Sequence, residues 1–105
     1  MGITVARDGV WVANYGDGTI SKINPDRNQV VATIAGGRAP RGIAHGRGSV
    51  WVTNELDDTV TRISVQTNRV TSTVAVGAAP SGIVYGRQAV WIANRLGRSV
   101  TRIQP

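Results

Sequence analysis

The sequence predicts an all-β protein built from a repeated unit of four short strands. Among its 105 residues, Val, Ile and Thr supply 34 side chains, whereas Leu, Met, Glu and Lys together supply five. β-Branched side chains fit extended strands, and the residues that best support helices are scarce, so the composition excludes an all-α fold. A 40-residue repeat and four strand patterns in each repeat make the prediction more specific.

The repeat is centred on Trp11, Trp51 and Trp91, which recur at a constant spacing of 40 residues. Each tryptophan lies between Val and either Val or Ile, and an Asn follows three residues later. Aligned without gaps, the first two units share 17 identities in 40 columns, and the second and third share 12 in 23. Units of about 40 residues with four strands are typical of β-propeller blades, which we therefore predict.

Strand patterns in the first unit occur over Ile3–Ala6, Val10–Asn14, Thr19–Asn24 and Gln29–Ala35. The second strand is apolar on both faces, because alternate side chains point to opposite sides of a sheet. Such a strand needs cover on both faces, which stacked four-stranded antiparallel meanders provide. The turn-forming residues between the strands are Asp8-Gly9, Gly16-Asp17-Gly18 and Pro25-Asp26-Arg27-Asn28.

The predicted organisation is a single partial propeller domain over residues 1–105. Its blades span residues 2–41, 42–81 and 82–105, and the last is incomplete because it stops after a third strand. A β-solenoid would repeat at a shorter period, whereas an open β-sandwich stays a structural alternative. The three tryptophans hold equivalent positions on the second strands, so we predict that they form the inter-blade core rather than a ligand cage.

The segments Pro40–Ile43, Trp51–Asn54 and Thr59–Ile63 resemble the YVTN and virginiamycin B lyase-like group of propellers, and the resemblance extends over all three units. It implies that the first strand of each blade lines a central channel and that the fourth lies at the rim. It also implies that the loops between strands two and three, and those between blades, share one face. That group usually places its binding sites on this face.

Two and three-quarter blades do not close a ring, since propellers usually have four to eight. The end blades are therefore expected to expose apolar faces, and the chain is expected to associate with itself. Two copies would supply six blades, which we favour over the nine blades of a homotrimer. The pattern fits both a piece of a longer natural propeller and an engineered or ancestral-type chain.

Composition restricts the partners of the chain. The net charge is +6, and there is no cysteine and only one histidine, so no disulfide framework, thiolate metal site or histidine-pair ligand set is available. No apolar segment indicates a membrane span or a leader peptide, and nothing indicates a compartment. The arginines are scattered along the chain and aromatic residues are few, so nucleic-acid binding is not expected.

The loops of the shared face carry charged side chains that are candidates for binding. Guanidinium groups suit bidentate contact with a carboxylate or a phosphate. Equivalent loops alternate in sign, which fits either solvated surface charge or ion pairing between blades. The adjacent Asp57 and Asp58 are only a weak indication of a cation site, because neighbouring carboxylates point in different directions and no full calcium-loop spacing follows. The candidate binding residues are Tyr15, Arg38, Arg41, Glu55, Asp57 and Arg95, and the candidates for contact between chains are Asp17 and Arg98.

Evidence for catalysis is limited. His45 lies on a first strand without a matched carboxylate column, so we interpret it as a channel-lining or packed side chain. In the lyase that the resemblance points to, activity depends on His and Glu side chains with magnesium. This chain carries asparagine where lyase blades often carry Glu, and Arg41 and Ser81 where they can carry His. We therefore expect a non-enzymatic, self-assembling binding scaffold without a cofactor. The alternative is a lyase-like enzyme whose site, formed by His45, Glu55 and a bound cation, is completed across chains.

Overall fold

The computed structural model describes residues 2–6 and 9–105, which form eleven β-strands. In the first unit the predicted strands agree with the observed ones, except that the second begins one residue earlier, at Gly9. The predicted turn residue Asp8 lies outside the described residues. Within residues 2–6 and 9–105, no helix is long and apolar enough to cross a membrane. The strands are β1 (Ile3–Ala6), β2 (Gly9–Asn14), β3 (Thr19–Asn24), β4 (Gln29–Ala35), β5 (Pro40–Gly46), β6 (Ser49–Asn54), β7 (Thr59–Ser64), β8 (Val70–Ala75), β9 (Pro80–Gly86), β10 (Ala89–Asn94) and β11 (Ser99–Ile103).

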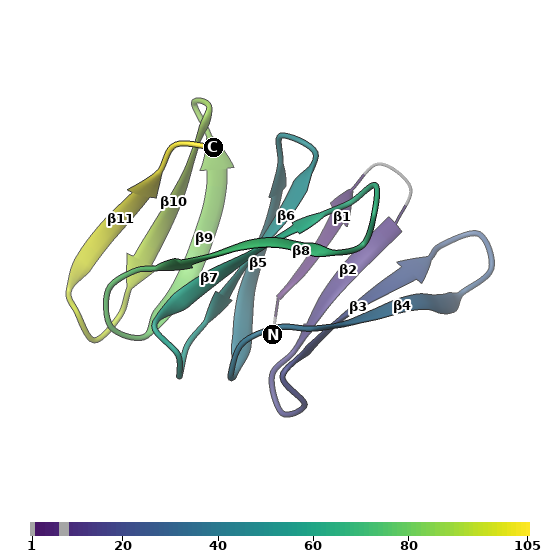
Figure 1. The fold of residues 1–105 in the computed structure, drawn as a ribbon, viewed down its shortest axis with the longest axis horizontal. Coiled ribbons are helices and arrows are strands. Elements are labelled where there is room, and N and C mark those ends of the chain that lie inside the picture. The colour runs from purple at the N-terminus through teal and green to yellow at the C-terminus, as the bar shows by residue number, and fades with distance from the viewer. Residues whose placement is uncertain (1, 7–8) are drawn as a thin grey trace.

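The strands form three antiparallel sheets in which each strand pairs with its neighbours in the sequence. We name them blade 1 (β1–β4), blade 2 (β5–β8) and blade 3 (β9–β11). Figure 1 shows the blades side by side in chain order, and contacts of β5 with β1 and β9 bring the first strands together. The predicted all-β fold of antiparallel propeller blades is therefore confirmed.

The connections between strands fall into two groups at opposite ends of the blades, because consecutive strands run antiparallel. The first group lies along the lower edge of Figure 1. It forms the loop face, which consists of residues 15–18, 36–39, 55–58, 76–79 and 95–98. The second group forms the turn face, which consists of residues 25–28, 47–48, 65–69 and 87–88.

The hydrophobic core lies between the blades rather than within them. Trp11 is buried against blade 2, in a cluster that includes Val50 and Val52 of β6. Trp51 is buried against blade 3, in a cluster that includes Val90 of β10. Because side chains alternate along a strand, β6 sends Trp51 to one neighbouring blade and its valines to the other. This double cover explains why the second strand is apolar on both faces.

Each tryptophan is also held by contacts within its own blade. The indole Nε1 of Trp51 donates to the carbonyl oxygen of Gly46 (3.3 Å), and the guanidinium of Arg62 lies 4.7 Å from the ring centroid. A cation over the face of an aromatic ring is attracted by the ring quadrupole. The equivalent pairs are Lys22 over Trp11 (5.2 Å) and Arg102 over Trp91 (5.5 Å).

The asparagine after each tryptophan motif fixes the turn into the third strand. Asn54 Nδ2 donates to Thr59 Oγ1 (3.1 Å) and to Thr61 Oγ1 (2.7 Å), and the other two asparagines form equivalent pairs. Asn54 Oδ1 accepts from the backbone N–H of Gly37 (3.2 Å), which belongs to the loop from blade 1. A Cβ on Gly37 would lie 2.5 Å from Asn54 Cγ, so this close approach requires glycine.

The two outer faces of the blade stack are exposed. Trp91 lies on the outer face of blade 3 and is 36% exposed, and Val84 and Val100 are still more exposed. Ile3 and Val5 are exposed on the outer face of blade 1. Within the described chain no further blade covers the Trp91 side of β10, so Trp91 lacks the inter-blade contacts that surround Trp11 and Trp51. The side chain instead forms part of an open apolar surface.

Candidate binding site on the loop face

The centre of the candidate site is Glu55, the first residue after β6. Tyr15 and Arg95 hold the same position in blades 1 and 3, since the three are 40 residues apart. The backbone N–H of Glu55 donates to the carbonyl oxygen of Ala39 (3.0 Å), and that of Arg95 donates to Ala79 (3.0 Å). The repeated loop geometry therefore brings side chains from three blades together.

The Glu55 carboxylate has partners on both oxygens. Tyr15 Oη donates to Oε1 (2.9 Å), and Arg41 Nη1 donates to Oε2 (2.7 Å). Arg95 Nη2 lies 3.8 Å from the same Oε2. The Glu55 side chain is 7% exposed, whereas those of Arg41 and Arg95 are 49% and 53% exposed. A nearly buried carboxylate is thus enclosed by two half-exposed guanidinium groups and one phenol.

These contacts define the ionisation of the cluster. The hydrogen bond from Tyr15 lowers the pKa of Glu55 below its ordinary value of 4.5, the Arg41 hydrogen bond acts in the same direction, and burial opposes both. The hydrogen bond to Glu55, followed by the charge of that carboxylate, raises the pKa of Tyr15 above 10.0. At neutral pH the cluster therefore holds a carboxylate, a neutral phenol and two guanidinium cations.

The two adjacent aspartates of blade 2 serve different loops. Asp57 Oδ2 accepts from the backbone N–H of Arg38 (2.8 Å), and Asp58 Oδ1 accepts from that of Ala79 (2.9 Å). The carboxylates therefore join blade 2 to the loops on either side instead of converging on one point. Within the described residues, no group of three or more His, Asp or Glu side chains is placed to hold a metal ion.

The structure does not bring His45 close to Glu55 within the chain. His45 pairs with Val50, whereas Glu55 follows Asn54, which pairs with Pro40 at the other end of β5. At about 3.3 Å per residue, the two positions lie roughly 16 Å apart along the strand. The set of His45, Glu55 and a cation considered from the sequence is therefore not assembled here.

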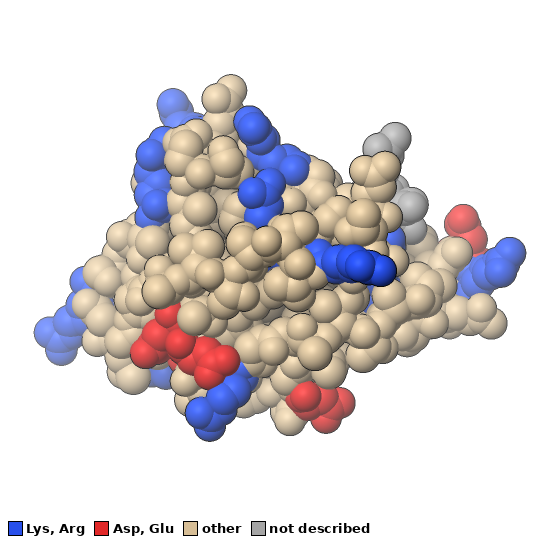
Figure 2. Space-filling model, in the orientation of Figure 1, with Lys and Arg blue, Asp and Glu red and all other residues tan. Residues whose placement is uncertain are grey.

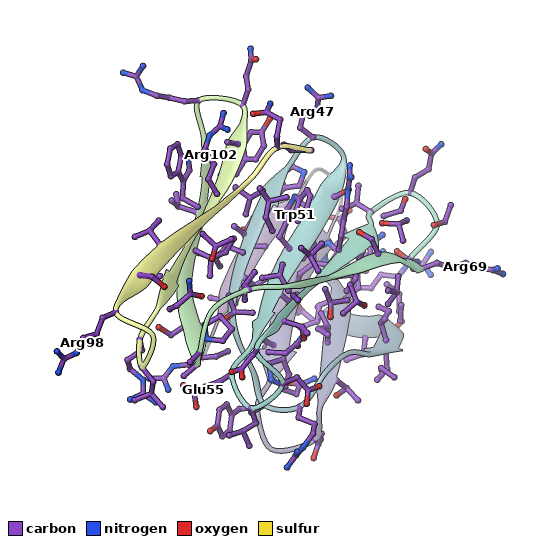
Figure 3. All side chains as sticks on the ribbon, turned by 60° about the vertical axis from the view of Figure 1, so that its left-hand side comes forward. Arg47, Trp51, Glu55, Arg69, Arg98 and Arg102 are labelled. Atoms are coloured by element: carbon purple, nitrogen blue, oxygen red, sulfur yellow. The ribbon has the colours of Figure 1, made fainter. Side chains whose placement is uncertain are left out.

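The candidate contacts between chains also lie apart from the cluster. Figure 3 shows Arg98 extending away from the loop that carries Glu55. Asp17 lies in the loop of blade 1, beside an open groove of ≈ 390 Å³ that is also lined by Tyr15, Arg38 and Leu56. The candidate binding residues thus divide into a contacting cluster and a groove at its side.

The fold of the chain is similar to those of solved structures, although no protein family and no curated protein matches its sequence. Hydrazine synthase of Kuenenia stuttgartiensis has a TM-score of 0.79 and 18% identity, over 96% of this chain and 34% of that chain. The computationally designed protein Ika4 has a TM-score of 0.83 and 14% identity, over 97% and 63%. Glutaminyl cyclase of Myxococcus xanthus has a TM-score of 0.70 and 10% identity, over 96% and 53%.

The chain has a β-propeller fold. The similar structures are propeller-like, and their likeness to this chain covers its three blades. The chain spans about a third of hydrazine synthase and less than two thirds of Ika4. At these identities the likeness concerns the fold alone, and no activity is carried over to the loop face.

The sequence pattern predicts candidate residues on the loop face but not how they pair. The charge alternation between equivalent loops left solvation and ion pairing both open, and the Glu55–Arg95 contact of 3.8 Å supports ion pairing between blades. The hydrogen bond of Tyr15 to Glu55 was not predicted. The sequence does contain the signal for this contact. Tyr15, Glu55 and Arg95 each follow the second strand of their blade, and equivalent positions on adjacent blades become neighbours.

Proposed function

We propose that this chain is a non-enzymatic propeller module that joins a second copy head to tail and offers its loop face for binding. The observation that supports the proposal is the repetition of one interface. At each buried junction, one blade contributes the face that carries its tryptophan, and the next blade contributes the opposite face, which carries Val or Ile of its second strand. We call these two faces the tryptophan half and the valine half. The two exposed ends of the stack carry one half each.

The outer face of blade 3 corresponds to the tryptophan half. Its exposed members Trp91 and Val100 are equivalent to Trp51 and Val60, which are buried against the next blade. An apolar groove of ≈ 260 Å³ lies on this face, lined in part by Trp91 and Val84. The surface that covers such a half inside the chain is the valine half of another blade.

The outer face of blade 1 corresponds to the valine half. Val10 and Val12 point away from blade 2, and on β1 they pair with the exposed Val5 and Ile3. The equivalent Val50 and Val52 are fully buried in the junction of blades 1 and 2. A second copy is therefore the partner whose chemistry fits both ends at once.

Head-to-tail addition forms a ring when the rotation closes and a filament when it does not. Two copies would supply six blades, within the usual range of four to eight, whereas three would supply nine. A propeller of the YVTN and virginiamycin B lyase-like type, which the sequence motifs resemble, is consistent with this arrangement. The resemblance and the copy number are parts of the proposal.

The loop face is suited to a small carboxylate. Arg41 and Arg95 share a single carboxylate, Glu55, so the cluster keeps one excess positive charge. Both guanidinium groups are about half exposed and have further N–H donors, and a planar fork suits bidentate contact with a carboxylate. In the proposed ring, Tyr15 of the second copy would approach Arg95 as Tyr15 approaches Glu55 in the chain.

The lyase-like alternative requires that His45 of one copy and Glu55 of another lie close together in the assembly. Head-to-tail addition keeps all loop faces at the same end, so Glu55 of one copy and His45 of another would still lie at different levels. This arrangement supports the non-enzymatic proposal. Magnesium-dependent ring opening of a cyclic depsipeptide is the direct assay, and turnover by the wild-type chain that is lost in Glu55→Gln would favour the enzyme instead.

Native mass spectrometry tests the assembly. We expect mainly twice the chain mass for the wild type and a folded monomer for Trp91→Lys, because a charge on the tryptophan half cannot be buried in the junction. Leu96→Lys is the matched control, since Leu96 is an exposed apolar residue of blade 3 that lies on the loop face. It should keep the wild-type mass. A monodisperse wild-type monomer would contradict the proposal, and three times the chain mass would replace six blades by nine.

A further inference from the structure

The charge of the molecule is distributed unevenly between its two ends. Among the described residues, the loop face carries three basic and four acidic side chains, and Arg41 at the adjacent start of β5 adds a fourth basic one. The rest of the described chain carries seven basic side chains and only Asp26 as an acid. The net charge of +6 therefore lies away from the loop face. Figure 2 shows basic side chains without acidic neighbours over its upper part, and acidic ones mainly along the lower edge. The seven are Lys22, Arg27, Arg47, Arg62, Arg69, Arg87 and Arg102.

The repeat accounts for this accumulation. Arg47 and Arg87 are equivalent residues, each at the turn between the first and second strands of its blade, and both are exposed. The third strands add Arg62, whose Nε donates to Ser49 Oγ (2.9 Å) beside that turn, and Arg102 of blade 3. Figure 3 shows Arg47 and Arg102 at the end opposite Glu55 and Arg98. Positions scattered in the sequence thus become neighbours on one surface.

The basic face is defined here as the three exposed arginines Arg47, Arg87 and Arg102, at the turn end of blades 2 and 3. We propose that this face binds the phosphate backbone of nucleic acid without reading its sequence. Arginine presents several donors in a planar fork that matches phosphate oxygens. The proposal goes beyond the assembly and the loop-face site, because it concerns the opposite end of the blades.

The form of the surface favours backbone contact over base recognition. The turn face consists of short turns, and the described residues contain no helix that could enter a groove. Contacts to phosphates position a protein but carry no sequence information. The sequence alone indicated no nucleic-acid partner because the arginines are not clustered along the chain. The fold gathers them.

A nucleic acid fits this face better than an anionic membrane does. The two exposed leucines, Leu56 and Leu96, lie on the loop face, so they cannot insert into a bilayer that approaches the arginines. Stable membrane attachment usually combines a basic patch with a buried apolar group. Nucleic-acid binding needs only the charge, since neutralising phosphates releases condensed counterions.

Fluorescence anisotropy with a labelled 16-base-pair DNA duplex tests the proposal over a series of salt concentrations. If each arginine of the basic face neutralises one phosphate, log K should fall with log salt at a slope of about −3 per chain. The double variant Arg47→Gln, Arg87→Gln should lower the magnitude of that slope by about 2 and weaken binding at low salt at least tenfold. Thermal unfolding and native mass should match the wild type, which separates this result from a failure of folding or assembly.

The matched control is Leu56→Glu, Leu96→Glu, which changes the net charge by the same two units on the loop face. It should keep the slope of the wild type. Equal losses in both double variants would mean that only the net charge attracts the duplex, which contradicts a binding face. Absence of binding by the wild type at low salt, or tighter binding to phosphatidylserine vesicles than to the duplex, would also overturn the proposal.

Discussion

Trp51 and Trp91 have the same sequence motif, the same place on the second strand and the same local contacts, but different surroundings. Their indole Nε1 atoms donate to Gly46 (3.3 Å) and Gly86 (3.1 Å), and an arginine lies over each ring. Trp51 is 1% exposed and Trp91 is 36% exposed. The motif therefore orients the ring, and the neighbouring blade supplies its burial. Stability should depend on where a blade stands in the stack.

Trp51→Ala is expected to have the largest effect, because it removes a fully buried aromatic side chain from the junction of blades 2 and 3. The loss in free energy of unfolding should be about 3–5 kcal/mol, as for other large aromatic residues in cores. Chemical denaturation at a protein concentration that keeps the chain monomeric measures it. Trp91→Ala is the comparison, and under these conditions its loss should be less than half as large. Equal losses would mean that the two environments do not differ as described.

A similar contrast holds for Asn54 and Asn94. Asn54 bridges Thr59, Thr61 and the backbone of Gly37, whereas the Oδ1 of Asn94 has no hydrogen-bond partner within the described residues. The preceding blade thus completes the hydrogen bonds of one asparagine but not of the other.

Asn54→Ala should therefore destabilise the chain more than Asn94→Ala does. Removing Asn54 leaves the buried Thr61 hydroxyl and the Gly37 N–H without their partner, and a buried unsatisfied group costs about 1–3 kcal/mol. Denaturation curves of both variants and of the wild type measure the difference. Asn54→Asp keeps the acceptor to Gly37 but loses both N–H donors, so it separates the two contributions. If Asn94→Ala proves as destabilising as Asn54→Ala, the contact with Gly37 contributes little.

The regular part of the molecule could be predicted from the sequence because it depends on local patterns. The alternation of apolar side chains and the 40-residue repeat located the strands of the first unit to within one residue. The second strand, apolar on both faces, required a neighbouring blade on each side. The site depends on contacts across blades, such as the one from Tyr15 to Glu55, whose geometry is set by how far each blade is rotated. The gathering of Arg47 and Arg87 has the same origin, since positions 40 apart become neighbours only in the stack.

The Glu55 cluster provides a smaller, pH-dependent contribution. The pKa of Glu55 is lowered, so its stabilisation is present above about pH 4.5 and is lost as the pH falls through the pKa of the folded state. The pKa of Tyr15 is raised, so its stabilisation is present below pH 10.0 and is lost as the pH rises above that value. The contribution of the cluster to stability should therefore be greatest between these limits.

Glu55→Gln should flatten the alkaline decline of stability, because the carboxylate is the main cause of the raised pKa of Tyr15. Thermal unfolding between pH 5 and pH 11 measures the profile, and Tyr15→Phe should flatten the same limb. Asp17→Asn is the control, since Asp17 lies outside the cluster. An alkaline decline that is unchanged in both Glu55→Gln and Tyr15→Phe would show that their hydrogen bond does not control the titration.

The smallest expected effect concerns Asp17 and Arg98, which the proposed ring places on opposite sides of the junction between copies. At the equivalent junction inside the chain, the loop at 36–39 lies between the loops of blades 1 and 2, and it is bonded to both through Gly36 and Arg38. Asp17 and Arg98 are both exposed on the loop face. An exposed ion pair contributes about 0–1 kcal/mol, so apolar packing should dominate and association should survive high salt.

Arg98→Asp should therefore weaken association only modestly, and adding Asp17→Arg should restore part of the loss, because the two changes act on one contact. Sedimentation equilibrium of the two single variants and the double variant measures the coupling. Arg98→Asp leaves the apolar outer face of blade 3 intact and therefore tests the contribution of charge alone. Trp91→Lys tests the contribution of the apolar face, whereas the loop charges only influence which ends of two copies meet. If the double variant shows the sum of the single effects, the loops do not meet, and their opposite signs are ordinary surface charge. Restoration that disappears at high salt would show that the residual coupling is electrostatic and that the tryptophan half alone holds the copies together.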